Sequence, residues 1–183
     1  MIGEPEIDRD GLRPVGGDCG VTMAVNSLKL AVKRWRDTTS QKGESVSDPD
    51  LVRFASIGEA LQWAGSLDDH WSQHYKRQEH RTTSTCCNQT LEGLRFARNR
   101  VVHDLIITAS GHDGMMFPLV FPLCFGHYEW RPARDLPLPT DGPGSGKEGE
   151  RQKDAYENCW QGEDVERTLD ALVSHFEELS RLK

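Results

Sequence analysis

LRFARNRVVHDL, residues 94–105, sets arginines, an asparagine and a histidine into an otherwise apolar pattern of helical period, which runs from Leu91 to Ala109. In an α-helix Asn99 and His103 lie on one face, and Arg98 lies at the flank of that face. A guanidinium offers a planar fork of donors that suits a phosphate, and an imidazole exchanges a proton near neutral pH. The three side chains together suit cleavage of RNA without a metal ion, so we expect no cofactor.

Length and composition predict one globular domain spanning residues 1–183. Hydrophobic residues make up 36% of the chain and charged residues 28%, which is typical of a soluble protein. No apolar run is long enough to span a bilayer, and the acidic first ten residues lack the features of a signal peptide. We therefore expect a cytoplasmic protein without membrane contact.

The chain contains five cysteines, an odd number without C-x-x-C spacing, which argues against a disulfide framework and against a zinc knuckle. The formal net charge of −7 is unfavourable for binding nucleic acid over a broad surface. Between Lys76 and Arg100, however, six basic residues stand against two acidic ones, a local charge of +4. The motif thus lies in a locally basic part of the chain.

The hydrophobic periodicity predicts a mainly all-α fold, an antiparallel helical bundle with a small β-hairpin or irregular insert. Amphipathic helices are expected over residues 18–37, 51–75 and 165–182, in addition to the motif helix. Pro49 stands where the second helix can start, and Gly58 or Gly65 is a possible break within it.

Residues 111–149 are expected to form a loose insert. Gly111 and Gly114 end the motif helix, and the two prolines within Met115–Phe125 restrict that segment to an edge strand or an irregular one. A second short strand around His127–Arg131 would complete a hairpin, and Asp135–Gly149 has the composition of a surface linker.

The pattern Arg98-Asn99-x-x-x-His103 resembles the signature of the HEPN superfamily, small helical bundles that include many RNases of toxin and antiviral systems. Several blocks are also similar to an uncharacterised group of HEPN-like actinobacterial proteins. These blocks are residues 59–64 with 67–69, residues 93–103, and residues 130–137. The similarity covers roughly residues 51–137.

This resemblance implies that Arg98 and His103 are a catalytic pair and that Asn99 positions one of them or the phosphate. It also implies a homodimer in which two motif helices face each other across one cleft, with RNA as substrate. A minimal nucleotidyltransferase antitoxin is a possible partner. An acidic residue of the preceding helix, Asp68 or Asp69, would complete the polar set.

Plainer interpretations stay open. The Arg98, Asn99 and His103 side chains can form a buried polar network, and the family also includes domains that bind a nucleotide or a protein without cleaving anything. Arg95 and Arg100 are expected to be solvated charges, with RNA phosphates as possible ligands.

Two other kinds of site compete with the nuclease. His70 and His74 have a zinc-binding spacing, followed by His80, Cys86 and Cys87, but no third ligand is fixed and no metal is expected. Cys19 lies at a helix start as a possible nucleophile, and His127 would be its base in a papain-like cysteine peptidase.

Overall fold

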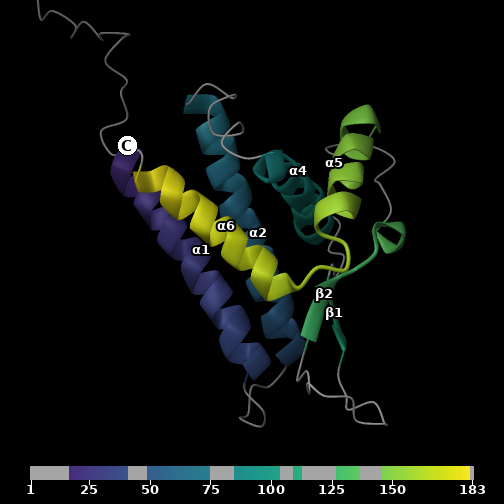
Figure 1. Ribbon diagram of the computed structural model, residues 1–183. Coiled ribbons are helices and arrows are strands. Elements are labelled where there is room, and N and C mark those ends of the chain that lie inside the picture. Colours follow the sequence, from purple (N-terminus) through teal and green to yellow (C-terminus); the bar gives the residue numbers. More distant parts are fainter. Residues whose placement is uncertain are drawn as a thin grey trace, which may run out of the picture.

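The computed structural model describes residues 17–40, 49–74, 85–103, 109–112, 127–136 and 146–181. Three long helices form one side of the molecule: α1 (Gly17–Ser40), α2 (Pro49–His74) and α6 (Val165–Arg181). α1 and α2 run antiparallel and pack along each other, and α6 lies across both (Figure 1). The prediction of a mainly helical bundle with a small strand pair is confirmed.

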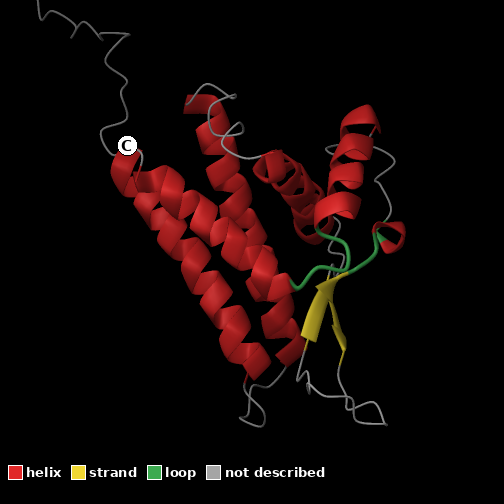
Figure 2. Cartoon of the chain, viewed as in Figure 1, coloured by secondary structure: helices red, strands yellow, loops and turns green. Residues whose placement is uncertain are grey.

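The other side of the molecule is built by α4 (Thr85–Arg98) and α5 (Gly146–Cys159), which pack on each other, while α4 also contacts α2 (Figure 1). A π-helical turn, η1 (Asn99–His103), continues α4 without interruption. The strands β1 (Ala109–His112) and β2 (His127–Trp130) pair antiparallel beside the ends of these helices, as Figure 2 shows. A 3-10 turn, η2 (Ala133–Asp135), follows β2.

The helices form where the sequence alternates apolar and polar residues with a period near 3.6. In α1 the buried residues recur every three or four positions from Val21 to Trp35, and α6 repeats the pattern from Val165 to Leu179. α2 contributes a similar stripe from Ile57 to Trp71 and runs unbroken through Gly58 and Gly65, so the expected break is absent from it. Each of the five α-helices within the described ranges, and β2 with them, contributes to one hydrophobic cluster.

The insert differs from the expected one in two respects. The first strand is β1, within Ala109–His112, so Ala109 and Gly111 belong to a strand instead of to the end of the motif helix. Residues 113–126, where the sequence analysis placed the first strand, lie outside the described residues. The last four residues of the expected linker are the first turn of α5.

α5 itself was not predicted, because its buried face has few apolar side chains. The buried residues of this helix are Gly149, Gln152, Ala155 and Tyr156. Its end is fixed by packing and by a turn: Trp160 packs against Trp130 with ring centroids 4.7 Å apart, and Gly162 adopts a positive φ of 74°. Asp164 then starts α6, with Oδ1 accepting a hydrogen bond from the backbone N–H of Arg167 at 2.7 Å.

Candidate functional site

The motif straddles a change in helix type. Arg98 is the last residue of α4, and the π-helical turn takes up Asn99 to His103. In an α-helix two positions five apart point about 140° away from each other. A π-turn, whose hydrogen bonds join residues i and i+5, reduces this difference to about 50°. The backbone at position 103 thereby comes onto the same side as that at position 98.

Arg98 is anchored to α2 by charge and by close packing. Its Nη1 lies 3.1 Å from Oδ2 of Asp69, and 19% of its side chain is exposed. The guanidinium rests on the backbone of Gly65, where a Cβ would come within 2.5 Å of Nη1. Arg98 is therefore held in one position while part of its fork of donors stays open to solvent.

Arg95, one turn earlier on α4, forms an ion pair with α2 and lies near Glu92 of its own helix. Its Nε and Nη2 lie 2.9 and 2.7 Å from Oδ2 of Asp68, whose side chain is fully buried. Burial lowers the pKa of the Arg95 guanidinium, but the charges of Asp68 and Glu92 outweigh it, so this pKa lies above its ordinary value. This buried ion pair joins α2 to α4 about one helical turn before Arg98.

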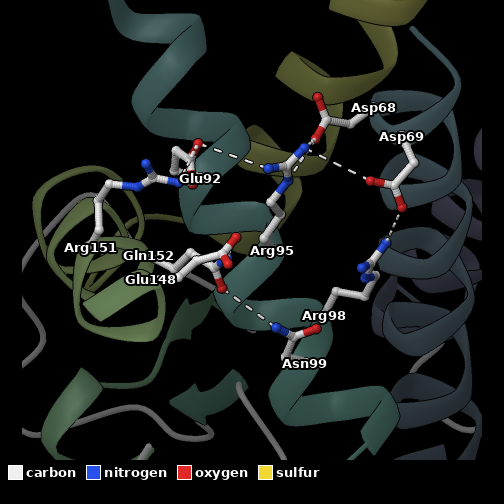
Figure 3. A network of polar contacts seen from close by, with 9 residues as sticks. All are labelled: Asp68, Asp69, Glu92, Arg95, Arg98, Asn99, Glu148, Arg151 and Gln152. Atoms are coloured by element: carbon white, nitrogen blue, oxygen red, sulfur yellow. Dashed lines mark hydrogen bonds and ion pairs between the residues drawn. The ribbon is translucent and has the colours of Figure 1, made fainter. Parts of the chain in front are cut away.

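Asp68 and Asp69 therefore have different roles, although the sequence left the choice between them open. Asp68 pairs with Arg95, and Asp69, whose side chain is 46% exposed, pairs with Arg98 and lies 3.8 Å from Arg95. Successive residues of a helix differ by about 100° in direction, which sends the two carboxylates to different arginines (Figure 3).

Asn99 is buried and points away from α2, toward α5. Its Nδ2 donates to Oε1 of Gln152 at 3.5 Å, and Nε2 of Gln152 donates to Oε1 of Glu148 at 3.3 Å. In Figure 3 the amide oxygen of Asn99 is turned toward the side on which Arg98 lies. α5 also contacts α4 through Arg151, whose Nη2 lies 3.3 Å from Oε2 of the buried Glu92.

Arg98 and Asn99 are neighbours at the end of α4, and their side chains are directed toward α2 and α5 respectively. The structure does not test their roles. The side chain of His103 lies outside the described side chains, so its catalytic role stays a prediction.

The expectation of solvated charges at Arg95 and Arg100 is wrong, because both side chains are buried. The guanidinium of Arg100 packs 5.5 Å from the centroid of the Phe96 ring. The three described arginines of the basic segment are thus buried or partly buried, and Arg95 and Arg98 are paired with carboxylates of α2. A phosphate contact by Arg95 or Arg100 is not part of the site described here.

The cysteine peptidase is contradicted by the position of the two residues it requires. Cys19 lies in the first turn of α1, whereas His127 starts β2, whose Tyr128 packs against Trp35 with ring centroids 5.0 Å apart. Sixteen residues of α-helix between Cys19 and Trp35 span about 24 Å. β2 lies beside the far end of α1 (Figure 1), so the backbones at positions 19 and 127 lie toward opposite ends of that helix.

The described residues include no group of three or more histidine, cysteine, aspartate or glutamate side chains arranged to hold a metal. His70 packs edge-on against Trp71. The side chains of His74, His80, Cys86 and Cys87 lie outside the described ones. Of the helices in the described ranges, none combines the length and apolarity needed to cross a membrane.

Sequence reasoning missed Gly65, Gln152 and Glu148. A glycine among larger residues of a helix can indicate that another element packs closely on its backbone. The same glycine can also indicate a helix break, which is how Gly65 is interpreted from the sequence. Gln152 carried no such signal, since a polar residue in a polar segment gives no sign of burial.

Comparison of the chain with protein-family models, with curated proteins and with solved structures gives no match.

Proposed function

We propose that this protein is a metal-independent endoribonuclease whose site is built from Arg98, Asn99 and His103. The observation that carries the proposal is the π-turn that begins directly after an anchored, partly exposed arginine. Single π-turns inside α-helices occur frequently at functional sites. Here the turn brings position 103 to the side of the helix from which the guanidinium of Arg98 extends.

The reaction follows from the chemistry of these groups. The RNA 2′-hydroxyl oxygen attacks the adjacent phosphorus and the bond from phosphorus to the 5′-oxygen breaks, leaving a 2′,3′-cyclic phosphate and a 5′-hydroxyl. His103 acts as the general base or acid, and in a homodimer its symmetry mate supplies the complementary step. Arg98 stabilises the negative charge that develops on the phosphorane.

Asp69 fits this reaction as the residue that orients Arg98. A carboxylate 3.1 Å from Nη1 keeps the Arg98 side chain in one rotamer, and the two charged groups together form a pair with no net charge. RNA, a second copy of the chain and an antitoxin of the minimal nucleotidyltransferase type are the partners in this proposal. A cytoplasmic location and a role in a toxin or antiviral system belong to it as well.

Cleavage of total RNA in the presence of EDTA tests the proposal. Wild type should produce 2′,3′-cyclic phosphate ends, and His103→Ala and Arg98→Ala should each abolish them. Arg98→Lys should retain little activity, because an ammonium cannot present the planar fork of donors. Arg167→Ala, which removes an arginine side chain 82% exposed on α6, is the matched control and should cleave like wild type. Full activity of both Ala variants at the motif would refute the site.

The ion pairs of the motif arginines favour a second function, a silent HEPN-like module that binds a nucleotide or a protein. In that case Asp69 would neutralise Arg98 permanently, and no RNA cleavage would occur. Binding of a short labelled RNA or nucleotide without any change in the ligand, lost in Arg98→Ala, would favour this function over the nuclease.

A further inference from the structure

We infer that α5 orients the motif, with Gln152 acting as a positioning residue for Asn99 and Glu148 fixing the direction of the Gln152 amide. This inference rests on the proposed function for its catalytic consequence, but the orientation itself is independent of any activity. α5 contains none of the three motif residues, and the inference gives this helix a role in orienting one of them.

The first step of the argument is burial. Asn99 and Gln152 are 5% and 4% exposed, so their amides depend on protein partners instead of on bulk water. Both positions are in the interior, where apolar side chains would not lower the solubility of the protein. Solubility therefore does not explain why both residues are polar. Two facing amides in the interface of α4 and α5 therefore constrain each other.

The second step is direction. A primary amide has a donor end and an acceptor end of nearly the same shape, so packing alone does not distinguish its two orientations. The Glu148 carboxylate only accepts, and it therefore attracts Nε2 of Gln152, at 3.3 Å. Oε1 of Gln152 is then left facing Asn99, and it accepts from Nδ2 at 3.5 Å.

The third step links this chain of contacts to the site. With its nitrogen committed to α5, Asn99 presents its amide oxygen toward the side of Arg98 (Figure 3). An acceptor there suits a ribose hydroxyl or the N–H of an imidazole. The contact of 3.5 Å is long, as hydrogen bonds of a catalytic site often are before substrate binds.

The same helix provides a matched control. Arg151 is the neighbour of Gln152 and joins α5 to α4 through Glu92, and among the described side chains of the motif it contacts neither Arg98 nor Asn99. Removing Arg151 loosens the packing of α5 without changing the direction of any amide. A merely structural role of α5 would make Arg151→Ala and Gln152→Leu equivalent.

The test has two readouts. In the first, the side-chain amide resonances of Asn99, assigned by comparison with Asn99→Asp, are followed by NMR. They should shift in Gln152→Leu and in Glu148→Ala, and stay close to wild type in Arg151→Ala. Glu148→Gln can donate as well as accept, so it removes the directional preference and should shift these resonances as Glu148→Ala does. Insensitivity of Asn99 to both Gln152→Leu and Glu148→Ala would overturn the inference.

In the second readout, RNA cleavage is measured for the same variants. Loss of one neutral hydrogen bond should lower kcat about tenfold in Gln152→Leu, with KM nearly unchanged. Glu148→Ala and Glu148→Gln should both fall in the same direction, and Arg151→Ala should stay near wild type. An equal loss in Arg151→Ala would overturn the positioning role. If wild type does not cleave RNA while the resonances behave as expected, the orientation by α5 holds and the proposed function fails.

Discussion

The guanidinium of Arg98 lies directly on the backbone of Gly65: a Cβ at that glycine would come within 2.5 Å of Nη1 and 2.6 Å of Cδ. The absence of a side chain at one position of α2 thus determines where the cation of the motif can lie. Asp69, one turn further along α2, then fixes the direction of the guanidinium.

Gly65→Ala should displace Arg98 and lower RNA cleavage at least tenfold. Alanine favours a helix over glycine by about 0.5–1 kcal/mol, which partly offsets the steric cost, so the free energy of unfolding should change little. Gly20→Ala is the control, because a Cβ at this helical glycine meets nothing within 4 Å. It should leave cleavage unchanged, and equal activity of the two variants would contradict the importance of this contact.

Asp68→Asn and Asp69→Asn should separate stability from function. Asp68 is fully buried against Arg95, and removing its charge leaves the cation with only the more distant carboxylates of Glu92 and Asp69, at a cost of about 2–3 kcal/mol in the free energy of unfolding. Asp69 is 46% exposed, so its loss should cost no more than about 1 kcal/mol while slowing cleavage. Urea unfolding and RNA cleavage of both variants measure the two effects, and the reverse order of stability would contradict the assignment of the two carboxylates.

Gly93→Ala should destabilise the packing of α4 on α5. A Cβ at Gly93 would lie 2.6 Å from Cδ1 of Trp160 and 3.3 Å from the backbone Cα of Tyr156, which has little room to move. Overpacking of this kind costs about 1–3 kcal/mol, measurable by urea unfolding. Gly58→Ala is the comparison, because its Cβ would meet only a methyl group of Val101, at 3.3 Å. A Gly93→Ala protein as stable as Gly58→Ala would be inconsistent with this close approach.

Tyr156 should make the protein less stable at alkaline pH. Burial raises the pKa of its hydroxyl, with a smaller opposing effect of Arg131, and the hydroxyl donates to the carbonyl of Arg131 at 2.8 Å. In the unfolded chain a tyrosine loses its proton near pH about 10. Above that pH the unfolded state binds fewer protons than the folded state, so the free energy of unfolding falls as the pH rises. Tyr156→Phe should be less stable at neutral pH and should lose part of this alkaline decline; an unchanged slope would refute the assignment.

The sequence was sufficient to predict the helices whose buried stripe is apolar. α1, α2 and α6 show such a stripe, and the start of α2 at Pro49 is confirmed. α5 could not be predicted in this way, because its contact with α4 uses Gly149, Gln152 and Tyr156. β1 was misplaced because the apolar pattern of the motif helix continues in sequence beyond the π-turn, although the described backbone is a strand from Ala109.

For the candidate site, the sequence predicted which residues of α4 to consider but not how they are paired. Nothing in the local pattern distinguishes Arg95 from Arg98, yet one is buried in an ion pair and the other is partly open to solvent. The difference arises from the packing of α2 on α4, which places two successive carboxylates opposite different arginines. Such pairing depends on tertiary contacts between residues 27 to 29 positions apart.

The pair formed by Asp68 and Arg95 also constrains how this chain can vary over time. A substitution of either partner alone would strand the opposite charge in the interior, whereas a joint exchange for two apolar side chains of similar volume would leave a well-packed interior. We therefore expect positions 68 and 95 to be either both retained or both substituted in related sequences. Such covariation would help to identify proteins with this fold.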